Sequence, residues 1–247
     1  MASINGTVSI APNDLYSSTA DRQGGLNPGA MVTDGNTGKK FRYALNGAVA
    51  LVVGNLLQEP ANDTTYANMA VTATAAGERD VNVTNGTSTI TSAQFEGGTL
   101  SVYTAGGIAV ADEYTIVAVR GTLTTGGALV VSLDRPLRTA WTTSAKVNMK
   151  RSMWSGVVAF PTTQTGVPCG VAIFPIAAGE YGWVQTHGEC AVLSDGSTFA
   201  VGSDLSSGSG TAGAVTVGTA GTTKVRVGAA RQVAAAAKGI SAFLQID

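Results

Sequence analysis

Apolar and polar residues alternate with a period of two in many short segments of this chain. Successive side chains of a strand point to opposite faces, so this period indicates strands with one buried face. Dipeptides that tolerate positive φ, such as Asn85-Gly86 and Asp195-Gly196, separate the segments and are typical of tight turns. The pattern predicts an all-β fold, with strands at 81–83, 100–102, 114–116, 131–133, 146–149, 215–217 and 225–227.

Two segments have a composition that favours a helix. Residues 62–76 start with Asn-Asp and continue with Ala and Met, which predicts one short helix. Residues 229–238 are rich in alanine, but they lie within an internal repeat whose other copy has a strand-like pattern. We therefore expect strands and a turn in this second segment, not a helix.

The internal repeat relates residues 170–185 to residues 228–245. Both copies contain Gly-x-Ala, an Ile or Val, Ala-Ala, a glycine and finally an aromatic residue two positions before Gln. Each copy predicts strand, tight turn, strand, and the second turn is the longer one. Duplicated hairpins suit a small closed β-barrel, because pairing its first and last strands removes exposed edges. Residues 41–56 are a candidate further hairpin of this barrel.

The order of these segments along the chain predicts three parts. Residues 1–40 are polar and contain Gly, Asn and Ser, which predicts an extended N-terminal arm that becomes ordered on a partner. Residues 41–76 and 153–247 form the barrel. Residues 77–152 have strands of their own between the barrel segments, which predicts an inserted module that is β-sandwich-like or β-barrel-like.

The chain carries few charges for its 247 residues: 15 Lys and Arg, and 16 Asp and Glu, with charged residues making up 13%. Soluble domains usually have about 25%, so much of the exterior is predicted to face partners rather than water. The charge balance argues against a nucleic-acid-binding surface, and Lys146, Lys150 and Arg151 near Trp154 are interpreted as a solvated strand face. The sequence predicts neither a secretory signal nor a membrane span.

The sequence lacks the residue combinations that catalysis needs. His187 is the only histidine, and it lies in neither a nucleophile elbow nor a metal motif. Acidic residues lie beside turn residues and are interpreted as solvated carboxylates rather than a catalytic pair. We therefore predict a protein that is not an enzyme, with no catalytic, cofactor or metal site. The acidic residues concerned are Glu59, Asp112, Glu113, Glu180, Asp195 and Asp204.

The two cysteines leave alternatives open. Cys169 and Cys190 lie symmetrically about Gly179-Glu180, so a hairpin turn there would place them opposite each other as disulfide partners. Two small buried thiols are the other interpretation, which the predicted lack of an export signal favours. With His187, the two cysteines also make a three-ligand zinc set, although the spacing of known zinc motifs is missing.

Four aromatic residues are candidates either for a sugar-stacking platform or for a core. Trp183 has an aromatic counterpart, Phe243, at the same place in the second copy of the repeat. This correspondence favours a barrel core or a subunit contact over a sugar platform. The four residues are Trp141, Trp154, Tyr181 and Trp183.

The C-terminal half resembles the β-barrel of tailed-phage head decoration (cement) proteins in four stretches, at 170–174, 176–188, 202–205 and 227–230. The upstream part resembles an inserted module of virion proteins from marine and environmental phages, at 97–100, 114–116 and 133–137. The residues that carry the motif and its repeat are Gly179, Tyr181, Gly182, Trp183, Gln185, Gly188, Gly228, Gly239, Phe243 and Gln245.

The resemblance implies a non-enzymatic virion protein that binds the outer capsid surface, often as a homotrimer, and stabilises the head. Its partners would be the major capsid protein and further copies of itself, with no nucleic acid and no membrane. It would be synthesised in the host bacterial cytoplasm and reside on the capsid of the virion. The sequence leaves open a carbohydrate-binding adhesin or fibre component of the phage head or tail, with Trp141 or Trp154 in the sugar platform.

Overall fold

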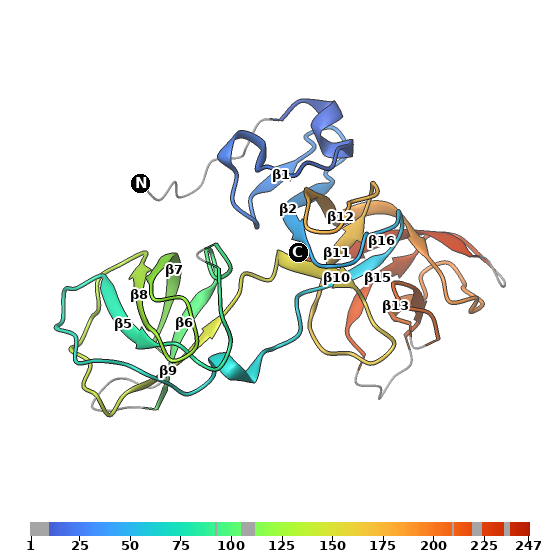
Figure 1. Ribbon diagram of the computed structural model, residues 1–247. Coiled ribbons are helices and arrows are strands. Elements are labelled where there is room, and N and C mark those ends of the chain that lie inside the picture. Colours follow the sequence, from blue (N-terminus) through green and yellow to red (C-terminus); the bar gives the residue numbers. More distant parts are fainter. Residues whose placement is uncertain (1–9, 92, 105–111, 209, 219–223, 235–237) are drawn as a thin grey trace. The chain divides into compact units, whose positions relative to one another are not determined.

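A computed structural model of the chain confirms the all-β prediction (Figure 1). It describes residues 10–91, 93–104, 112–208, 210–218, 224–234 and 238–247. Strands account for 44% of the structure, and the helical elements among the described residues are three short 3-10 turns. These turns are η1 (Pro12–Tyr16), η2 (Gln23–Gly25) and η3 (Thr64–Tyr66).

The short helix predicted at 62–76 is only the single turn η3. Asp63 caps this turn, because its side chain accepts a hydrogen bond from the backbone N–H of Thr65 at 2.9 Å. The chain then continues directly into a strand, β4 (Met69–Ala70). Six of the predicted strand segments lie wholly within strands, and the seventh begins one residue later than predicted, at Arg226.

The described chain divides into two units, residues 62–152 and residues 10–61 with 153–247. The insert therefore begins at residue 62, not at 77 as the sequence predicts. The reason is β4, in which Met69 pairs with Val147 of β9 (Lys146–Lys150), a strand of the insert. We call the two units the insert and the barrel unit.

Five strands of the barrel unit form a closed ring. The ring closes because β12 pairs with β2 on one edge and with β11 on the other. All five strands contribute to one buried apolar cluster, which includes Ala44, Leu57, Val157, Cys169 and Val184 and fills the interior. In order around the ring the strands are β2 (Lys40–Asn46), β10 (Ser155–Ala159), β3 (Leu56–Gln58), β11 (Pro168–Ala172) and β12 (Tyr181–Leu193).

The predicted hairpin at 41–56 is wrong, because β10 lies between β2 and β3. β10 runs parallel to β2 and antiparallel to β3. Two parallel neighbouring strands cannot be joined by a tight turn. Here β10 follows β2 in the sequence only after the whole insert. The interior of the ring is thus completed by chain that follows residue 152.

The second half of β12 carries the sheet beyond the ring. Residues 187–193 pair with β16, and the strands that follow enclose a second apolar cluster containing Val192, Phe199, Leu205 and Leu244. The second copy of the repeat therefore lies outside the closed ring, although both copies are antiparallel strand pairs as predicted. The added strands, in order, are β16 (Gly239–Gln245), β15 (Arg226–Ala230), β13 (Asp204–Ser207) and β14 (Val215–Val217).

The described part of the predicted arm packs on the barrel unit itself, not away from it. β1 (Met31–Thr33) pairs antiparallel with β2, and Thr19 forms a bridge with Tyr181. The segment 10–33 also contributes apolar residues to the cluster around Trp183, and this burial explains why the segment is folded. The residues are Ile10, Leu15, Leu26, Ala30 and Val32.

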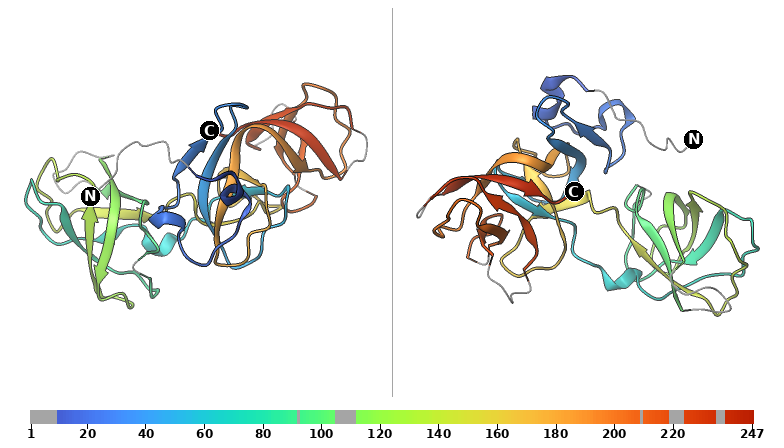
Figure 2. Two further views of the ribbon diagram at one scale, coloured as in Figure 1. Left: turned by 90° about the horizontal axis from the view of Figure 1, so that it is seen from above. Right: turned by 180° about the vertical axis from the view of Figure 1, so that it is seen from behind.

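The insert is a second curled sheet, with every ladder antiparallel. An isolated bridge joins Val71, the residue after β4, to Val83 of the other end strand, so of the two predicted forms the structure has the barrel-like one (Figures 1 and 2). Its core includes Val81, Leu100, Ile116, Leu129, Trp141 and Val147. The sheet order is β4, β9, β6 (Thr99–Thr104), β7 (Glu113–Gly121), β8 (Ala128–Leu133) and β5 (Asp80–Thr84).

Candidate functional site

The motif at 181–188 occupies the first part of β12, where its aromatic residues are covered by the N-terminal segment. Trp183 is only 1% exposed, and its ring centroid lies 5.1 Å from that of Tyr43. Its indole N–H donates to Oε1 of Gln23 at 3.0 Å. Tyr43 also stacks on Tyr181, with ring centroids 5.6 Å apart. The tryptophan is therefore a core residue, as the core interpretation predicts.

Gln185 and Gly188 build a bulge at the point where β12 changes partners. The register with β2 shifts between Gln185 and His187. The buried amide of Gln185 donates to the carbonyl oxygens of His187 and Glu189, both at 2.9 Å. Gly188 has φ 88°, a conformation that favours glycine. These motif residues shape the strand, because bulges bend a strand and end a pairing.

The remaining motif glycines have steric roles. Gly179 has φ 73° in the turn before β12. A Cβ on Gly182 would lie 2.7 Å from Cδ1 of Ile176, and one on Gly228 would lie 2.1 Å from the carbonyl oxygen of Phe243. Gly239 has more room, since its nearest neighbour would be 3.6 Å away.

The second copy does not reproduce the environment of the first. Phe243 is half-buried and packs edge-on against the ring of His187, with centroids 5.2 Å apart. Gln245 is exposed, whereas Gln185 is 2% exposed. The structure brings Phe243 together with the first copy across the β12–β16 ladder, but not into an equivalent pocket.

The two cysteines are separate buried thiols, and the structure contains no bond between them. Cys169 lies in the interior of the ring, whereas Cys190 pairs with Ala242 and belongs to the second cluster. Burial raises the pKa of Cys190 to about 11 and also raises the pKa of Cys169. The disulfide alternative fails because the hairpin register is centred before Gly179-Glu180, so the two residues do not face each other.

His187 sits on β12 with its ring against Phe243, and the described residues give its buried Nδ1 no hydrogen-bond partner. Within the described ranges, no three His, Cys, Asp or Glu side chains gather closely enough to hold a metal ion. Nor does any described helix have the length and apolar character needed to span a membrane.

Two of the carboxylates interpreted as solvated are buried. Glu59 is 7% exposed, and its Oε1 accepts from the backbone N–H of Val167 at 3.3 Å. Asp112 is 9% exposed and accepts from the Tyr114 hydroxyl at 2.5 Å. Burial, together with this bond, raises the pKa of Tyr114. Position beside turn residues was a poor guide here, because burial depends on segments that are distant in sequence.

The two tryptophans considered for a sugar platform do not offer an open ring face. Trp141 is 1% exposed in the core of the insert, edge-on to Tyr114 with ring centroids 6.0 Å apart. Trp154 is half-buried, and the guanidinium of Arg42 lies over its ring at 4.8 Å. Neither tryptophan therefore has the freely exposed ring that a sugar platform would use, and the adhesin alternative stays a prediction.

Residues 47–54, in the loop between β2 and β3, expose apolar side chains. Val49, Val52 and Val53 are 74%, 64% and 50% exposed, while Leu51 between them is 2% exposed. From Arg42 to Glu59 the chain contains no other charged residue. We call this segment the valine loop.

The valine loop is held in place by hydrogen bonds. The buried amide of Asn46 donates to the carbonyl oxygens of Val49, Ile176 and Ala177 at 2.9–3.0 Å. The backbone N–H of Leu51 donates to Ile176, and that of Gly54 donates to Ala172 at 2.8 Å. The exposed valines are thus carried by a loop that is hydrogen-bonded to the ring and to the connection before β12.

Comparison with known proteins gives this chain no relative: no protein-family model, no curated protein and no solved structure matches it.

Proposed function

We propose that this protein is a non-enzymatic structural protein of a tailed-phage virion that binds the outer face of the capsid and stabilises the head. Two observations support the proposal. The sequence at 181–188 resembles that of the β-barrel in tailed-phage head decoration proteins. The valine loop supplies an apolar docking surface, and it is the observation on which the proposal mainly rests.

The energetics of the valine loop favour a protein partner. Complete burial of a valine side chain contributes about 1.5–3 kcal/mol. The loop is already ordered through Asn46 and Leu51, so little conformational entropy remains to be lost on binding. The partner that we propose is the major capsid protein, and further copies of the chain would join as a homotrimer.

Stabilisation of the head would follow from mass action. A protein that binds the assembled shell, but not its separated subunits, shifts the equilibrium toward the shell. Each bound copy contributes, and copies joined in a trimer would bind with an increased effective concentration. The sparse charge of the chain, 13% of its residues, suits a surface shared with neighbouring subunits.

Co-sedimentation with purified heads of the encoding phage tests this proposal. Val49→Asp and Val52→Asp together place two charges in the valine loop, and we expect at least about a tenfold loss of head binding. Val233→Asp is the matched control, because Val233 is 73% exposed in a different loop of the same unit. Wild-type chain that fails to sediment with heads, or equal losses in both variants, would contradict the proposal.

A further inference from the structure

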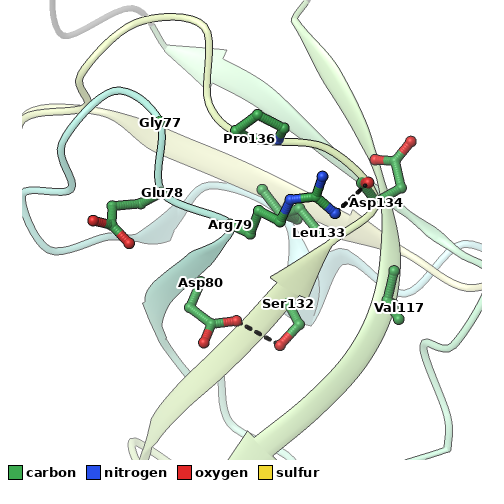
Figure 3. Close-up of a pocket in the computed structure, with 9 residues that line it drawn as sticks. All are labelled: Gly77, Glu78, Arg79, Asp80, Val117, Ser132, Leu133, Asp134 and Pro136. Atoms are coloured by element: carbon green, nitrogen blue, oxygen red, sulfur yellow. Dashed lines mark hydrogen bonds between the residues drawn. The ribbon is translucent and has the colours of Figure 1, made fainter. Parts of the chain in front are cut away.

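A cavity of about 640 Å³ lies on the outer face of the insert (Figure 3). Its walls come from the loop before β5, from the first residue of β5, from Val117 in β7 and from the end of β8 with the loop that follows. This volume is within the range of small-molecule sites in proteins.

The walls of the cavity are fixed by the backbone. The N–H groups of Leu133 and Leu137 donate to the carbonyl oxygens of Arg79 and Glu78, both at 2.8 Å. In the β7–β8 ladder the register shifts between Ile116 and Ala118, so Val117 is the extra residue of a bulge. Bulges re-aim side chains and are frequent beside functional sites. Here the bulge places Val117, which is 48% exposed, at the cavity.

The three acidic side chains that line the cavity are offset by three arginines, one in the lining and two beside it. The Asp80 carboxylate is 2.6 Å from both Arg120 and the Ser132 hydroxyl. The Asp134 carboxylate has its own cation, Arg135, at 3.6 Å. Glu78 and Arg79 complete three acidic and three basic side chains at or beside the cavity. Neither an anionic nor a cationic ligand is favoured by this balance.

Donors and acceptors are both present. Arg79 donates through one nitrogen to the Asp134 carbonyl oxygen at 3.1 Å, and a guanidinium has five N–H donors in all (Figure 3). Asp80 is oriented by two fixed donors, and a carboxylate accepts further hydrogen bonds. Val117 and Pro136 add apolar surface beside these groups.

We infer that this cavity binds a neutral saccharide. Sugar hydroxyls both donate and accept, which matches Arg79 and Asp80, and the C–H face of a sugar ring matches Val117 and Pro136. Aromatic rings do not line this cavity among the described residues. We therefore expect a dissociation constant on the order of 0.1–1 mM for one site. The apparent affinity would be higher when many copies are displayed together.

Isothermal titration of the full chain with a panel of trisaccharides tests the inference. The panel contains neutral chitotriose, cellotriose and maltotriose, together with a sialylated and a sulfated trisaccharide. We expect binding of at least one neutral member. Failure of all neutral members up to about 10 mM, or binding of the anionic members alone, would overturn the inference.

Variants locate the site. Arg79→Gln removes the charged donor and should weaken saccharide binding about tenfold, and Val117→Lys should do the same by filling the cavity. Arg231→Gln, an exposed arginine of the barrel unit, is the matched control and should bind normally. Circular dichroism checks the fold of each variant. Unchanged binding in both cavity variants would place the saccharide elsewhere and overturn the inference. Head binding is measured in parallel and should be unaffected by these variants, so this result is independent of the proposed function.

Discussion

Residues 170–185 and 228–245 share one sequence frame, but they bury different parts of it. In the first copy, Trp183 and Gln185 are nearly inaccessible to solvent, whereas their counterparts Phe243 and Gln245 are half-buried and exposed. Both copies form antiparallel strand pairs. For Trp183 the difference comes from the segment 10–33, which joins its cluster. Gln185 is buried because β12 pairs there with β11 on one side and β2 on the other. A repeat thus specifies a local structure, while burial depends on what the rest of the chain packs against it.

The largest test of this comparison is removal of the first 33 residues. We expect the truncated chain to lose roughly 5 kcal/mol or more of unfolding free energy, because Phe41, Tyr43 and Trp183 become exposed together. Hydrogen exchange measured by mass spectrometry should show lost protection in β2 and β12, with the insert unchanged as the internal control. Normal protection in β12 would mean that the segment is not part of the core.

Single substitutions sharpen the comparison. Trp183→Ala should cost about 3–5 kcal/mol, since it removes a buried ring and its hydrogen bond to Gln23. Phe243→Ala, the matched change in the second copy, should cost about 2 kcal/mol or less because that ring is half-buried. Urea unfolding, followed by circular dichroism, measures both. Equal costs would show that the two copies are equivalent after all.

The glutamines give the smallest expected effect. Gln185→Ala leaves the carbonyl oxygens of His187 and Glu189 without their buried donor and should cost about 1–3 kcal/mol. Gln245→Ala changes an exposed side chain and should stay within about 0.5 kcal/mol. The same unfolding measurement applies. A large effect of Gln245→Ala would reveal a contact made by the second copy in an assembly.

The insert strands β5 to β9 and the two strand pairs of the repeat were predictable, because alternation and turn dipeptides are local signals, whereas β4 was not. Closure of the ring was not predictable in the same way, since β10 reaches its place between β2 and β3 only after the whole insert. The cover over Trp183 was missed because the segment 10–33 reads as polar overall, although five apolar residues within it make the contact.

The valine loop and the cavity of the insert were likewise only partly predictable from local sequence. The chain from Ala44 to Leu57 is visibly apolar, but alternation did not indicate that Val49 and Val52 point outward while Leu51 points inward. That arrangement depends on Asn46, whose buried amide holds carbonyl groups from two different loops. The cavity of the insert depends on the bulge at Val117, and a one-residue bulge leaves little trace in a period-two pattern.

The pairing of β3 with β10 has a consequence for protein engineering. The chain leaves the ring after Gln58 and returns at Ser155, and the two strands concerned are antiparallel neighbours, with Leu57 opposite Ala159. We therefore expect that a short reverse turn can connect them in place of residues 62–152. The ring thus provides a natural grafting position, at which one cassette can be exchanged for another while the host scaffold keeps its strand order.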